Sequence, residues 1–165
     1  MKVYHGSTET VKLPLVGIGR KFLDFGCGFY VTDIKEQAVS WATRPLNAGK
    51  PHILNIYDFN NDNMNSLGIY RMLKFDAYSE DWLEFVVSNR QGKNLWKEFD
   101  ISEGGIANDR IFNTIELYST GLISKSETLQ RLKYQKPNNQ ICILNQEIID
   151  KYLTFQEAFT IPSER

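Results

Sequence analysis

The chain has 165 residues, which is the size of one ordinary domain. Hydrophobic residues make up 42% of the chain, charged residues 24% and aromatic residues 13%, and this composition excludes a disordered protein. The formal net charge of -1 gives no overall positive field for nucleic acid, so a nucleic-acid substrate would need a local patch.

Cysteine and histidine usage narrows the class of protein further. Cys27 and Cys142 are the only cysteines, too few for a disulfide scaffold or a cysteine-built zinc site. His5 and His52 lack a metal-ligand spacing, so we expect no metal site. No signal-peptide pattern opens the chain, and the apolar run 141–144 is too short to span a bilayer. These features predict a cytoplasmic protein without a membrane segment.

No linker, low-complexity tract or repeat divides the chain, so we expect residues 1–165 to form a single domain. A first strand is predicted over 2–7. Four glycines then mark a loop over 16–28.

A second strand is predicted over 29–32, and it leads into a helix. Asp33 stands at the N-cap position of this helix, Glu36 at the capping-box position, and the helix should end before Pro45. A third strand over 52–59 and a polar turn over 60–65 follow.

Helical patterns dominate the second half of the chain. The strongest pattern begins after Ser79, and its buried face is predicted to contain Trp82, Phe85, Val86 and Asn89. Two further helices are expected over 109–119 and 124–134, the second with a Ser124/Glu127 capping box. Short strands are expected over 140–144 and 148–155. Strands at both ends with helices between them predict an α+β fold, because the connections do not repeat as βαβ units.

Three segments carry the strongest functional signal. They are the strand His5-Gly6-Ser7, the stretch from Phe25 to Asp33 that contains Gly26, Gly28 and Tyr30, and the late strand opening Asn139-Gln140-Ile141-Cys142. Together they resemble the ADP-ribosyltransferase superfamily, on its diphtheria-toxin and poly(ADP-ribose) polymerase side. The signature of that side is a His-Gly-Ser/Thr strand, a Gly-x-Gly-x-Tyr strand with a helix behind it, and an acidic residue heading a later strand.

The resemblance implies an ADP-ribosyltransferase-like fold with two small, mainly antiparallel sheets around an NAD cleft and flanking helices. It implies a mono-ADP-ribosyltransferase that uses NAD as co-substrate, cleaves the bond between nicotinamide and ribose, and transfers ADP-ribose to an acceptor. Protein, nucleic acid, small molecule and water all remain open as acceptors. A toxin role with an antitoxin or immunity partner is a further expectation from the resemblance alone.

The family pattern also implies residue roles. His5 would donate to the 2'-hydroxyl of the adenosine ribose, and Ser7 would assist nearby. The Gly6 backbone would hold the nicotinamide carboxamide, while Tyr30 and Trp41 would stack on the two faces of the nicotinamide ring. Two aromatic faces suit a flat pyridinium, each stacking contact being worth on the order of 1 kcal/mol.

Gln140 stands where the family usually has Glu. A neutral amide can hold a ribose hydroxyl, but it supplies neither negative charge nor a base. Either another acid supplies the charge, or the acceptor is already a good nucleophile, or the protein only binds NAD. We favour another acid.

The middle of the chain offers candidates for that acid and for a pyrophosphate clamp. A Trp-containing helix ends in Asn89-Arg90, and Ala107-Asn108-Asp109-Arg110 follows a glycine pair. This layout looks like an uncharacterised bacterial branch of ADP-ribosyltransferase-like domains. Asp109 is the preferred acid, and Arg90 or Arg110 would hold the phosphates.

Each of these residues also has a purely structural interpretation. His5 and Gln140 could be satisfied strand residues, Tyr30 and Trp41 core aromatics, and Asp109 and Arg110 a helix cap and a surface pair. Two rival functions remain: a hydrolase with a Cys27 thiolate and His5, and a pseudo-enzyme or interaction module that binds NAD without turnover.

Overall fold

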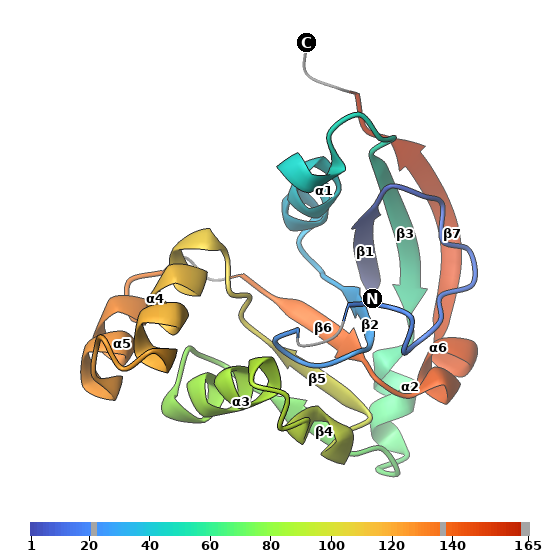
Figure 1. Cartoon of the computed structure of the whole chain (residues 1–165). Coiled ribbons are helices and arrows are strands. Elements are labelled where there is room, and N and C mark those ends of the chain that lie inside the picture. The colour runs from blue at the N-terminus through green and yellow to red at the C-terminus, as the bar shows by residue number, and fades with distance from the viewer. Residues whose placement is uncertain (21–22, 136–137, 163–165) are drawn as a thin grey trace.

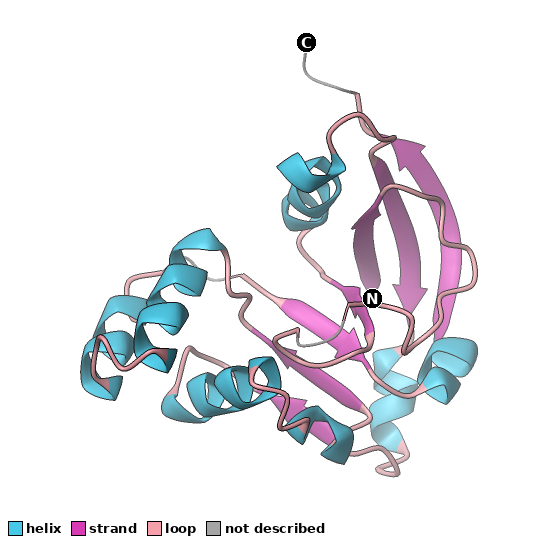
Figure 2. Cartoon of the chain, viewed as in Figure 1, coloured by secondary structure: helices cyan, strands magenta, loops and turns pink. Residues whose placement is uncertain are grey.

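The computed structural model describes residues 1–20, 23–135 and 138–162, without the side chain of Asp109 (Figure 1). The described residues form two small sheets and six α-helices, which confirms the α+β class (Figure 2). The strands are β1 (Lys2–Ser7), β2 (Phe29–Val31), β3 (Ile53–Phe59), β4 (Met72–Lys74), β5 (Ile101–Gly104), β6 (Gln140–Ile143) and β7 (Leu153–Thr160). The helices are α1 (Lys35–Thr43), α2 (Asn61–Ser66), α3 (Glu80–Arg90), α4 (Asp109–Ser119), α5 (Lys125–Leu132) and α6 (Gln146–Tyr152). None of them is long and apolar enough to cross a membrane.

The two sheets are neighbours that meet at one point. The first has the order β1-β3-β7 and the second the order β2-β6-β5-β4. All pairings are antiparallel except the one between β4 and β5. A bridge between Tyr4 and Thr32 joins the edge strands β1 and β2. The chain therefore places β1, β2 and β6 side by side.

Three apolar clusters hold these layers together. The first lies between the sheets and includes Val3 and Tyr57 of one sheet and Ile141 of the other. The second packs the opposite face of the second sheet against α3 and α4, with Trp82 and Ile111 fully buried. The third packs α1 against the outer face of β3. In Figure 1, α1 accordingly lies at the first sheet, and α3, α4 and α5 gather at the second.

Local signals place several elements correctly. Ser79 accepts a hydrogen bond from the Trp82 amide and caps α3, whose predicted apolar face is buried. Ser124 caps α5 in the same way, by accepting from Glu127. These helices begin where a side-chain oxygen satisfies an amide that lacks a partner within the helix.

Three expectations are wrong. Ile34, not Asp33, is the N-cap of α1, because the buried Thr32 hydroxyl already accepts the Ile34 amide. The predicted turn over 60–65 is the helix α2, which is held to the core by the buried Met64.

The predicted strand over 148–155 is divided. It forms the end of α6, which buries Ile148 and Ile149, and then β7, which begins at Leu153. The strands β4 and β5 are not predicted at all. In each case burial against distant elements decides the outcome, since the local sequence is compatible with more than one structure.

Candidate functional site

The site begins where β1 and β2 separate. The two strands exchange backbone hydrogen bonds at Tyr4 and Thr32, of 2.8 and 2.9 Å. In the antiparallel register the next rung would join Gly6 to Tyr30. Instead, the His5 ring lies between the strands, with its Nδ1 2.7 Å from the Tyr30 carbonyl oxygen. We call this point, formed by His5, Gly6 and Tyr30, the split.

Gly6 presents its backbone at the split. Successive residues of a strand point their N–H and C=O groups to opposite edges. The N–H and C=O groups of Tyr4 bond to β2, so the N–H and C=O groups of Gly6, two residues later, point to the same edge. Among the described residues, these Gly6 groups make no hydrogen bond to β2. A Cβ at Gly6 would lie 1.7 Å from the Ala38 carbonyl oxygen. Only glycine therefore allows α1 to pack this close to the open strand edge.

Tyr30 and Gln140 share one face of the second sheet. Tyr30 pairs with Cys142, and Gln140 lies two residues earlier on the same strand. The Tyr30 hydroxyl donates to the Gly26 carbonyl over 2.7 Å, and burial raises the pKa of Tyr30 well above its usual value. Gln140 is 4% exposed, and its side-chain Nε2 approaches the Gly105 carbonyl at 3.5 Å. The phenol is thus a neutral, fixed ring, and the amide is held loosely.

His5 is a neutral hydrogen-bond acceptor. Burial lowers the pKa of His5 below 6.5, and the positive charge of Arg44 acts in the same direction, although the bond to Tyr30 opposes both. A neutral ring whose Nδ1 donates to the Tyr30 carbonyl leaves Nε2 without a proton. In this form Nε2 accepts a hydrogen bond, so in a complex the ribose hydroxyl would be the donor to His5.

Arg44, which no sequence motif marks, acts electrostatically on this imidazole, and Arg20 acts on Arg44. Arg44 follows α1 and is exposed, and its positive charge helps to lower the pKa of His5. Burial and the nearby guanidinium of Arg20 both lower the pKa of Arg44. Neither arginine forms an ion pair with a carboxylate among the described residues, and neighbouring like charges favour an anion between them. No motif marks them, because they come from two separate loops.

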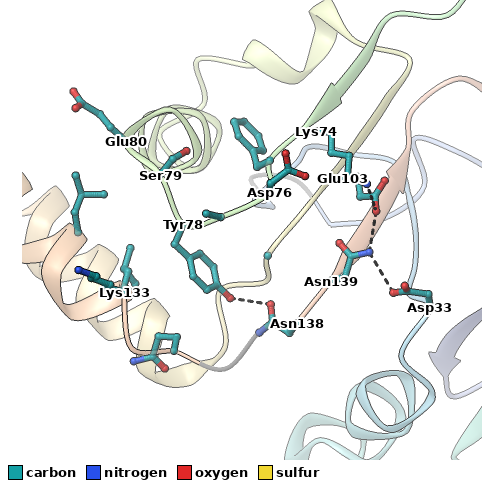
Figure 3. Close-up of a pocket in the computed structure, with 16 residues that line it drawn as sticks. Asp33, Lys74, Asp76, Tyr78, Ser79, Glu80, Glu103, Lys133, Asn138 and Asn139 are labelled. Atoms are coloured by element: carbon teal, nitrogen blue, oxygen red, sulfur yellow. Dashed lines mark hydrogen bonds and ion pairs between the residues drawn. The ribbon is translucent and has the colours of Figure 1, made fainter.

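Asn139, the residue before Gln140, is the centre of a polar cluster. Its Nδ2 donates to Asp33 over 3.2 Å and to Glu103 over 3.0 Å. Lys74 lies 3.4 Å from the same Glu103 carboxylate. Figure 3 shows these residues along one wall of a cavity of about 720 Å³. The cluster thus brings two carboxylates to the residue beside Gln140.

The opposite wall of the cavity is built from loops. Tyr78 donates to the Asn138 side chain over 2.8 Å (Figure 3), and that side chain also accepts the Ile106 amide. Gly105, whose carbonyl Gln140 approaches, belongs to the lining as well.

A second polar network lies between Asp24 and α3. Arg90 binds the Asp24 carboxylate through Nη2 at 2.6 Å and Nε at 2.8 Å, and the ring of Phe112 lies 4.7 Å from its guanidinium carbon. Asn89 donates to the Asp24 carbonyl, and the Ala107 amide donates to the carboxylate. Because Arg90 already holds a carboxylate, this arrangement favours a structural role over a pyrophosphate clamp.

The remaining predicted residues lie as follows. Trp41 is one turn beyond Gln37 on α1 and is partly buried against the third cluster. The Ser7 hydroxyl accepts from the Glu9 amide. Arg110 is exposed in the first turn of α4. Asp109 begins that helix, but its side chain is outside the described part of the chain.

The geometry does not support a Cys27/His5 pair. The Cys27 thiol approaches the Gly19 carbonyl at 3.7 Å, and His5 is bonded to Tyr30. No hydrogen bond joins the two side chains among the described residues. Nor do the described residues contain a cluster of three or more His, Cys, Asp or Glu that could hold a metal ion.

Comparison with known proteins places the chain in one family. No curated protein and no solved structure matches it. One family model, described as "Protein of unknown function (DUF3990)", matches residues 1–155. Because this match covers almost the whole chain, the chain belongs to the DUF3990 family.

Proposed function

We propose that this protein is an NAD-dependent mono-ADP-ribosyltransferase that binds NAD at the split. One observation supports the proposal: the adjoining strands β1, β2 and β6 carry the imidazole of His5, the open backbone of Gly6, the phenol of Tyr30 and the carboxamide of Gln140, and His5 Nδ1 lies 2.7 Å from the Tyr30 carbonyl oxygen. The same residues gave the resemblance to the ADP-ribosyltransferase superfamily.

The nicotinamide half of NAD suits the Gly6 edge. A primary amide can donate through its NH2 group and accept through its carbonyl oxygen, and the glycine backbone that faces the split offers one acceptor and one donor in return. Tyr30 supplies one aromatic face. Trp41 supplies the second in this proposal, since it follows by one turn Gln37, whose side chain binds Asn139 just before β6.

The other half of NAD meets polar and positive groups. The Nε2 atom of His5 accepts from the hydroxyl of the adenosine ribose. Arg44 and Arg20 face the pyrophosphate, whose charge they complement. Arg44 and Arg20 thus replace Arg90 as the proposed ligands of the pyrophosphate, and Arg110 remains a second candidate.

The reaction breaks the bond between nicotinamide and C1' of the ribose. The bonding electron pair leaves with nicotinamide, which becomes neutral, and positive charge develops on the sugar. A lone pair of the acceptor then forms the new bond to C1', and the acceptor loses a proton. Gln140 holds a ribose hydroxyl but cannot balance the charge. Asp109 is the candidate for this role; Glu103 binds Asn139, but it pairs with Ile141 and so lies on the other face of the sheet from Gln140, and it serves as the comparison.

Nicotinamide release from labelled NAD tests the proposal. Wild-type protein should release nicotinamide, and His5→Ala or Tyr30→Phe should separate the parts of the site. We expect His5→Ala to lose at least tenfold in kcat/KM, whereas Tyr30→Phe, which keeps the ring, should lose less. Glu103→Gln and Asp109→Asn, assayed in parallel, decide which carboxylate stabilises the sugar cation.

A binding-only role is the second candidate, and it is favoured by the contact between Gln140 and Gly105. NAD titration by calorimetry separates the two. Binding without nicotinamide release at high protein concentration would assign a pseudo-enzyme, and absence of both would overturn the proposal.

A further inference from the structure

Gln37 makes an unusual contact for a helix side chain. Its Nε2 donates to the Asn139 carbonyl, and its Oε1 accepts the Asn139 amide over 3.2 Å. One side-chain amide thus satisfies both backbone groups of a single residue, as a neighbouring strand would do. Strand β6 begins at the next residue, Gln140.

The contact joins two parts of the split that are far apart in the sequence. Gln37 belongs to α1, and α1 packs closely on β1, since the backbone of Ala38 and Ala42 occupies the space that a Cβ at Gly6 would need. Asn139 immediately precedes the Gln140 amide. This residue pair is therefore a second link, besides the strand pairing through β2, between the strand edge that offers Gly6 and the strand that offers Gln140.

The side chain of Asn139 strengthens this link. Its amide donates to Asp33, which precedes α1, and to Glu103 on β5. Two carboxylates that hold one neutral amide resist its rotation, since charge-assisted hydrogen bonds are stronger than neutral ones. Backbone and side chain of Asn139 are thus held from both sides.

We propose that Gln37 is a positioning residue that holds the start of β6, and with it Gln140, against α1 and the Gly6 edge. This inference rests on the proposed function, because Gln140 and Gly6 are assigned there to the ribose and to the carboxamide. Its role toward the reaction is indirect: Gln37 acts through the backbone of Asn139.

The first experiment measures the link without any ligand. Hydrogen exchange of the Asn139 and Gln140 amides should become about tenfold faster in Gln37→Met, which keeps the length of the side chain and removes both hydrogen bonds. Amides of β3 should not change. Ser40→Ala, on an exposed position of the same helix, is the matched control. Unchanged exchange at Asn139 in Gln37→Met would overturn the inference.

The second experiment is a double-mutant cycle on ligand affinity. Gln37→Met should weaken NAD about tenfold and leave free nicotinamide within twofold, because nicotinamide lacks the ribose that Gln140 holds. Gln140→Ala should show the same selectivity, and the double variant should bind NAD no worse than Gln140→Ala alone. Additive losses, or equal losses for NAD and nicotinamide, would show that Gln37 only supports the fold.

Asn139→Ala separates the contribution of the Asn139 side chain from that of its backbone. It removes the bonds to Asp33 and Glu103 but keeps the backbone that Gln37 binds, so its effect should be smaller than that of Gln37→Met. A wild-type protein that binds no NAD would refute the proposed function, while the exchange result would still decide whether Gln37 holds β6.

Discussion

The split and the Asp24–Arg90 network both come from stretches rich in glycine and polar residues, yet their polar groups are used in opposite ways. In the network, the Asp24 carboxylate has partners on Arg90 and Ala107, and its backbone is bound by Asn89. At the split, the Gly6 backbone faces an edge that β2 has left, and His5 uses one ring nitrogen.

This difference separates structural from ligand-binding chemistry. A buried charge must be paired, so the network is complete without a ligand. An open backbone edge and an imidazole acceptor have capacity left for hydrogen bonds. The sequence presents both as candidate sites, and the hydrogen bonds distinguish them. The following predictions test that distinction, starting with the largest effect.

Asp24→Ala should destabilise the fold most. It leaves the Arg90 guanidinium, whose side chain is 21% exposed, without its partner, and the breaking of such a pair costs about 3–5 kcal/mol. The free energy of unfolding in urea measures the loss. Asp24→Ala/Arg90→Met should recover part of it, because both charges are then gone. A loss below about 1 kcal/mol, as for surface pairs, would refute the structural role.

Gly6→Ala should affect both stability and binding. The new methyl group meets the Ala38 carbonyl and pushes α1 outward, at a cost of about 1–3 kcal/mol. Because Gln37 and Trp41 move with α1, nicotinamide affinity should fall as well. Gly49→Ala, where a Cβ would meet no neighbour although the φ of 77° is strained, is the control for backbone strain. Unchanged nicotinamide affinity in Gly6→Ala would argue against the split as the binding site.

The neutral ring of His5 should make both the stability of the fold and the affinity for NAD depend on pH. Because burial lowers the pKa of His5 in the folded state, the unfolded chain binds the proton first as the pH falls. Stability contributed by the neutral ring is complete above pH 6.5 and is lost as the pH falls below it, with a slope of at most about 1.4 kcal/mol per pH unit. NAD affinity should fall only at lower pH, as the pH approaches the lowered pKa of His5 in the folded state, since protonated Nε2 cannot accept.

His5→Gln provides the control for that pH profile, because its amide does not titrate. Unfolding curves and NAD titrations between pH 5 and pH 8 should be flatter in this variant. Equal slopes in variant and wild type would assign the pH dependence to another group.

Arg44→Ala should have the smallest effect on stability and a selective effect on binding. Arg44 is exposed and has no carboxylate partner among the described residues, so the free energy of unfolding should change by less than about 0.5 kcal/mol. NAD affinity should fall several-fold and depend less on salt, while nicotinamide affinity stays the same. Lys50→Ala, also exposed, is the charge control. An equal loss for NAD and nicotinamide would exclude a phosphate contact.

Local patterns were sufficient for some elements and insufficient for others. The caps of α3 and α5 were predictable because Ser79 and Ser124 bond amides three residues away. The division of 148–155 into helix and strand was not, since Ile148 and Leu153 are buried by residues from other parts of the chain.

The site shows the same limit. His5, Tyr30 and Gln140 could be selected because their motifs are contiguous. The link from Gln37 to Asn139 spans 102 residues, and the pairing of Asp24 with Arg90 spans 66. Such contacts leave no periodicity in a single sequence, because they depend on how two distant elements are placed.

The sequence by itself determined the α+β class, the residue types at the three strand segments and the chemistry that those types allow, since propensity, capping and hydrogen-bonding capacity belong to individual residues and their neighbours. Only the tertiary structure decided which of these groups are satisfied. The tautomer of His5, the open edge of Gly6 and the engagement of Arg90 all follow from elements that meet only in the folded chain. Hydrogen bonding and burial are properties of that meeting, and they separate the groups that hold the fold from those left to bind a ligand.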